Sequence, residues 1–78
     1  MPATKYQAHE AAIRQFLADR GLLIKDLADK TGLSRKTLSI HINGEPMTWA
    51  VLSAVATALD VMPDAIAHPI AADEAVAG

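Results

Sequence analysis

The sequence LIKDLADKTGLSRKTLSIHING, residues 23–44, decides the fold, because it indicates two short helices joined by a tight turn at Gly32. Ser34 is a good N-cap for the second helix, since its hydroxyl can accept a hydrogen bond from an early helical N–H. Gly44 tolerates the left-handed conformation that commonly closes a helix. The second helix is therefore expected over residues 35–43.

The second helix has two chemically different faces when its residues are placed at about 100° intervals. Its inward face is expected to hold Thr37, Leu38, His41 and Ile42. Its outward face carries two cations, a hydroxyl, an amide, one aliphatic side chain and no carboxylate: Arg35, Lys36, Ser39, Ile40 and Asn43. Such groups donate to guanine, to phosphates or to both, and an aliphatic group contacts the thymine methyl. The outward face therefore predicts a helix that reads DNA.

Apolar residues at helical spacing predict further helices around this pair. We expect an all-α fold of five helices, over residues 5–20, 24–31, 35–43, 49–59 and 63–67. The first has Tyr6, Ile13, Phe16 and Leu17 on one stripe, with His9 at its edge. The fourth is capped by Thr48 and buries Trp49, Leu52, Val55, Ala56 and Leu59. The last begins with Pro63, whose missing N–H is harmless there, and ends before Pro69.

The length of 78 residues suffices for one small domain. The chain has no cysteine, so apolar packing must hold it together without disulfides or thiolate-bound metal. It has neither the apolar run of a signal peptide nor a stretch long enough to span a membrane. We expect a cytoplasmic, nucleoid-associated protein with a domain at 1–67 and a flexible, acidic and Ala-rich tail at 68–78.

Charge is distributed unevenly along the chain, although the net charge is only −2. Residues 1–44 hold all seven Lys and Arg against four acids, a balance of +3, whereas residues 45–78 hold five acids and no base. A basic half facing phosphates and an acidic half facing away is compatible with DNA binding.

A set of glycine and apolar positions extends over about residues 13–67: Gly21, Leu27, Ala28, Gly32, Leu38, Ser39, Asn43, Gly44, Leu52, Val55, Ala56 and Leu59. The chain resembles the Cro/lambda-repressor-like (XRE) helix-turn-helix family, because these residues stand at the spacing typical of that family. The resemblance implies a lambda-repressor-like DNA-binding domain whose helix 35–43 enters the major groove.

The chain departs from that family at two places. Relatives usually begin the helix at 24–31 with a Ser, Thr or Asn cap and a phosphate-contacting Gln, where this chain has Leu23 and Ile24; Lys25 is the nearest substitute. Many relatives also bury an Arg–Glu pair at the positions of Leu17 and Ile42. Replacing a buried ion pair by two apolar residues is often neutral or stabilising, so the double change is compatible with the same fold.

The expected DNA-binding residues extend beyond the outward face to Lys25, Ser34, Thr37 and Thr48. Arg35 and Lys36 are the best candidates for base contacts, followed by Ser39 and Ile40, while Asn43 is expected to bind phosphate. For Arg35 and Lys36, the alternative is an ordinary solvated helix end.

Two aromatic residues have competing interpretations. His41 is expected to be a packed, neutral histidine bonded to a backbone carbonyl, and the alternative is a pH-sensitive or DNA-contacting residue. Trp49 is expected to cover the core beneath the helix at 35–43 rather than to stack on bases.

The preferred function is sequence-specific binding of double-stranded DNA by a transcriptional regulator of the phage or bacterial repressor type. A weak or DNA-induced homodimer on a palindromic operator is expected, because one such helix reads only a few base pairs. The alternative is an antitoxin or protein-interaction module whose C-terminal tail binds a partner protein. An enzyme is the weakest interpretation, because no catalytic motif appears, and neither metal nor cofactor is expected.

Overall fold

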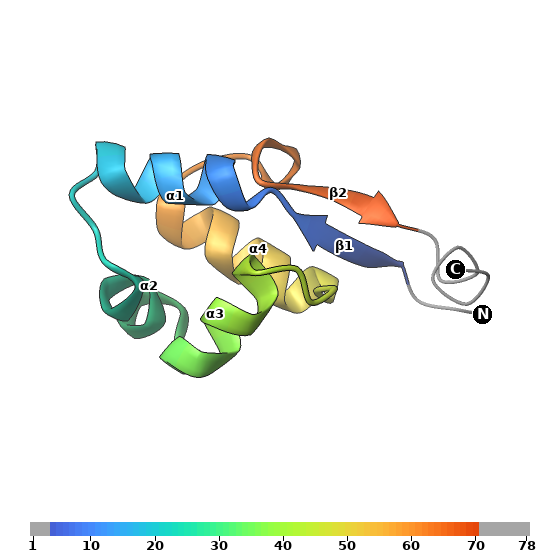
Figure 1. The fold of residues 1–78 in the computed structure, drawn as a ribbon, viewed down its shortest axis with the longest axis horizontal. Coiled ribbons are helices and arrows are strands. Elements are labelled where there is room, and N and C mark those ends of the chain that lie inside the picture. Colours follow the sequence, from blue (N-terminus) through green and yellow to red (C-terminus); the bar gives the residue numbers. More distant parts are fainter. Residues whose placement is uncertain (1–3, 71–78) are drawn as a thin grey trace.

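The computed structural model describes residues 4–70, which form four α-helices and a two-stranded antiparallel sheet (Figure 1). In chain order the elements are β1 (Lys5–Ala8), α1 (Glu10–Asp19), α2 (Ile24–Thr31), α3 (Arg35–Ile42), α4 (Trp49–Leu59), the 3-10 turn η1 (Pro63–Ala65) and β2 (Ala67–Ile70). The predicted bounds of α2 and α4 are confirmed, and α3 ends one residue before the predicted position.

Local signals place α2, α3 and α4 as the sequence predicts. Gly32 has a φ of 77°, which glycine adopts without steric penalty, and it separates α2 from α3. Ser34 and Thr48 each accept a hydrogen bond from a backbone N–H at the start of α3 and α4. The turn between α2 and α3 and the starts of α3 and α4 therefore depend on residues that are visible in the sequence.

A single apolar core holds the four helices together. Its largest fully buried side chains are Ile13, Leu27, Leu38, Met47, Leu52, Leu59 and Ile66. Leu17 and Ile42 are buried in the same core, so these two aliphatic side chains pack inside the domain. Burying them avoids the desolvation cost of a charged pair.

The first predicted helix is wrong over residues 5–8, which form β1. Tyr6 and Ala8 are two residues apart, and both pack on the core, as alternate residues of a strand do. Tyr6 exchanges two backbone hydrogen bonds with Met47, with N···O distances of 2.9 and 2.8 Å. In the sequence, the apolar position of Tyr6 fits the period of a helix as well as that of a strand. The residues that pair with this strand lie far along the chain, so no local pattern indicates it.

The predicted helix at 63–67 is also wrong, since η1 covers only Pro63–Ala65 and β2 follows it. β2 pairs with β1 in the register Lys5 with Ile70 and Tyr6 with Pro69. Opposite residues of an antiparallel pair alternate between bonded and non-bonded, and Tyr6 directs its N–H and C=O towards Met47. Pro69 is therefore tolerated in the strand, because its position requires no N–H.

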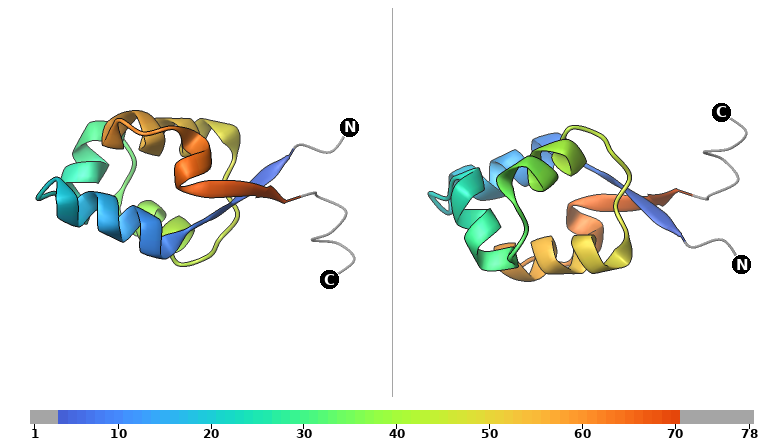
Figure 2. Two further views of the ribbon diagram at one scale, coloured as in Figure 1. Left: turned by 90° about the horizontal axis from the view of Figure 1, so that it is seen from above. Right: turned by 90° about the horizontal axis from the view of Figure 1, so that it is seen from below.

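The sheet changes the boundary expected between domain and tail. His68, Pro69 and Ile70, which were predicted to begin the tail, belong to β2. Residues 71–78, the rest of the predicted tail, lie outside the described residues. Figure 2 shows the sheet at the end of the molecule opposite α2. Among the described residues, no helix combines the length and the apolar character that a membrane crossing requires.

Candidate nucleic-acid interface

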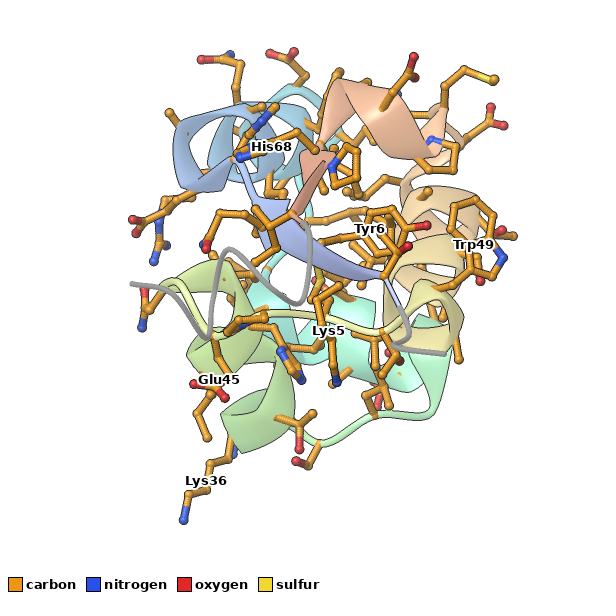
Figure 3. The ribbon with its side chains drawn as sticks, turned by 90° about the vertical axis from the view of Figure 1, so that its right-hand side faces the viewer. Lys5, Tyr6, Lys36, Glu45, Trp49 and His68 are labelled. Carbon is orange, nitrogen blue, oxygen red and sulfur yellow. The ribbon has the colours of Figure 1, made fainter. Side chains whose placement is uncertain are left out.

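The N-terminal end of α3 presents two cations to solvent. Arg35 and Lys36 are both exposed, and within residues 4–70 neither side chain makes a hydrogen bond or an ion pair. Figure 3 shows Lys36 directed away from the body of the molecule. Both charges are therefore free to meet the acceptors of DNA bases or phosphates.

The remainder of the outward face follows along the same helix. Ile40 is 45% exposed, which is high for a large aliphatic side chain and agrees with its predicted position. Ser39 is half-buried, and Asn43 is exposed at the C-cap. On the opposite side, Leu38 and Ile42 are buried. The helix is thus anchored by one face and presents the other to solvent.

Ser34 and Thr37, two further candidates, are bonded to one another. The Thr37 N–H donates to Ser34 Oγ at 3.0 Å, and Ser34 Oγ donates to Thr37 Oγ1 at 2.9 Å. This arrangement uses the Ser34 proton internally and leaves the Thr37 hydroxyl proton available. In this conformation, Ser34 starts the helix and only Thr37 retains a donor for DNA.

Lys25 and Thr48 lie outside α3. Lys25 is exposed in the first turn of α2, and Thr48 accepts a hydrogen bond from the Val51 N–H at 3.4 Å. The Thr48 hydroxyl caps α4 as an acceptor and can still donate its proton. Neither residue belongs to α3, so neither is part of its outward face.

Two polar residues beside the C-terminal end of α3 were not predicted as part of the site. The Arg14 guanidinium pairs with Glu10 Oε2 at 2.9 Å and lies 3.5 Å from Asn43 Oδ1. Gln7 Nε2 donates to the Gly44 carbonyl oxygen at 3.0 Å. No local sequence signal pointed to Gln7, because its position depends on β1. Arg14 adds a cation next to the expected phosphate contact Asn43.

The two aromatic residues with competing interpretations, His41 and Trp49, lie in different surroundings. His41 is half-buried, and its Nδ1 lies 3.1 Å from the Glu45 carbonyl oxygen, as predicted for a packed histidine. The prediction that Trp49 covers the core is wrong, because this side chain is 54% exposed. Its ring lies against that of Tyr6, with ring centroids 5.7 Å apart. Figure 3 shows this aromatic pair apart from Lys36, on another side of the molecule.

An anchored helix with a polar outward face, following a second helix across a glycine turn, defines a helix-turn-helix DNA-binding protein. The model of the Cro/C1-type HTH DNA-binding domain family matches residues 12–71, most of the chain. The chain belongs to this family. No curated protein and no solved structure gave a significant match.

Proposed function

We propose that the protein is a sequence-specific transcriptional regulator of the phage or bacterial repressor type, acting on double-stranded DNA in the cytoplasm. In this proposal α3 enters the major groove, with Arg35 and Lys36 on base edges and Ser39 and Ile40 beside them. A regulator of this kind represses by occupying the site that the transcription machinery needs.

The observation that carries the proposal is the open, cationic N-terminal end of α3. Base readout requires donors that are not already paired within the protein, and Arg35 and Lys36 meet that requirement within residues 4–70. Phosphate contacts are assigned to the surrounding Lys25, Asn43 and Thr48, and Thr37 keeps one donor for the same purpose. We add Arg14 to this set because of its position beside Asn43.

The experiment that tests this proposal is selection from a random pool of duplexes, followed by titration of the recovered sequence at several salt concentrations. We expect one enriched sequence, bound 10³-fold or more above random DNA, as is typical of specific binders. Binding of every duplex with equal affinity would contradict the proposal, as would the absence of any complex at low ionic strength.

We also propose that two copies bind one palindromic operator, because a single α3 reads only a few base pairs. Sedimentation of the protein with a selected duplex is expected to give two chains per duplex. A single chain per duplex at saturation would contradict the dimer while leaving DNA recognition intact.

A further inference from the structure

The turn at the C-terminal end of α3 is contacted by the strand β1, which lies far from it in the sequence. Ile40 and Asn43, the two members of the outward face nearest this end, precede the turn at Gly44. Gly44 has a φ of 132°, outside the range that L side chains readily adopt. The direction in which the chain leaves α3 is therefore set at this residue.

Two groups of hydrogen bonds fix that turn. From within, the Gly44 N–H donates to the His41 carbonyl at 3.2 Å and the Glu45 N–H to the Ile40 carbonyl at 3.1 Å. From β1, Gln7 Nε2 donates to the Gly44 carbonyl at 3.0 Å. The neighbouring Tyr6 exchanges two backbone bonds with Met47, three residues beyond Gly44. β1 is thus hydrogen-bonded to the connector at Gly44 and again at Met47.

The side chain of Gln7 reaches α3 because of its register in the sheet. Alternate residues of a strand point to opposite faces, so Gln7 points away from the face that packs Tyr6 and Ala8 on the core. It is half-buried, and its amide is the only side-chain donor to the Gly44 carbonyl among residues 4–70. A hydrogen bond of this kind orients its acceptor as well as stabilising it.

We infer that Gln7 is a positioning residue for DNA recognition: it fixes the C-terminal turn of α3 and thereby sets the depth at which Ile40 and Asn43 meet the DNA. This inference rests on the proposed function. Gln7 does not read a base itself. Its effect is confined to the end of α3 that it holds, while Arg35 and Lys36 at the other end depend on the Ser34 cap.

The test is Gln7→Met, which keeps the length of the side chain and removes its donor. The matched control is Gln15→Met, since Gln15 Nε2 donates at 2.8 Å to Asp19 within α1, away from α3. In the free protein we expect the amide hydrogens of Gly44 and Glu45 to exchange about fivefold faster in Gln7→Met, with α4 unchanged. Gln15→Met leaves these rates unchanged. Equal protection of Gly44 and Glu45 in wild type and Gln7→Met would overturn the inference without any reference to DNA.

Binding provides the second readout, on the selected duplex and its single-base variants. The base positions that depend on each end of α3 are first assigned with Ile40→Ala and Arg35→Ala. We expect Gln7→Met to weaken binding about threefold to tenfold and to flatten the preference at the Ile40-dependent positions only. A merely structural role would lower all preferences together, and that result would overturn the inference. If wild type itself selects no sequence, the proposed function fails, and the exchange rates separately decide whether Gln7 holds the turn.

Discussion

At the scale of single residues, the outward face of α3 divides into groups with different expected roles. Arg35 is exposed and unpaired within the described residues, and its guanidinium matches the two acceptors of guanine. We expect Arg35→Ala to cost about 1–3 kcal/mol on the selected site and to relax preference at one base position. Fluorescence anisotropy against single-base variants measures both effects. Asn43→Ala is the comparison, since loss of a phosphate contact weakens binding across all sequences. Equal losses on specific and random DNA for Arg35→Ala would remove it from base readout.

Lys25 has a different expected effect, because a contact with phosphate is detected by how strongly the binding constant depends on salt concentration. Each phosphate neutralised by a cation releases counterions and adds about 0.9 to the slope of log K against log salt. We expect Lys25→Ala to reduce that slope by about one, equally on selected and random duplexes. Arg20→Ala is the control, since Arg20 lies over the Phe16 ring, 5.2 Å from its centroid, at the end of α1. A slope unchanged in Lys25→Ala would place Lys25 outside the interface.

At the scale of elements, α2 begins without an ordinary cap, as its sequence predicts. Leu23 occupies the N-cap position with an extended backbone, and its side chain has no hydrogen-bond acceptor. Of the two bonds in a capping box, only the one from the Leu23 N–H to Asp26 Oδ2 is made, at 2.9 Å. Leu23 is 60% exposed, so little packing is lost on replacing it. We expect Leu23→Ser to stabilise the domain by about 0.5–2 kcal/mol, measured by thermal unfolding. Leu23→Ala, which adds no acceptor, should show no comparable gain. A Tm for Leu23→Ser equal to that of Leu23→Ala would show that the backbone cannot use the cap.

The helices and the strands differ in how far the sequence alone predicts them. Helices α2 to α4 depend on residues within one or two turns of each other, such as Gly32, Ser34 and Thr48, so their positions were predictable. The sheet depends on pairing between residues about sixty positions apart, for which no local pattern exists. Gln7 was missed for that reason, because a helix over 5–20 gives it no relation to Gly44. Most of the outward face was predicted because it requires only the helical period.

At the scale of the whole molecule, charged and apolar residues are distributed unevenly. All seven Lys and Arg belong to residues 5–36, and the chain from residue 45 onward has neither Lys nor Arg. The apolar hollow that Trp49 lines with Tyr6 and Met62 is separate from α3 and includes two of the most exposed large apolar side chains, at 54% and 70%. None of the residues that line this hollow belongs to α3.

The proposed pair of chains on one operator makes a prediction about spacing. Two α3 helices in one dimer reach successive major grooves on the same side of DNA only when the half-site centres are about 34 Å apart, one helical turn. Inserting five base pairs between half-sites turns them to opposite sides, so we expect the affinity to fall to that of a single half-site. Gel-shift titration of duplexes with zero, five and ten inserted pairs measures this, with an isolated half-site as the control. Ten inserted base pairs return the half-sites to the same side of the DNA but double the distance between their centres. We therefore expect a dimer whose two chains touch not to recover its affinity. Equal affinity at all three spacings would show that each chain binds alone.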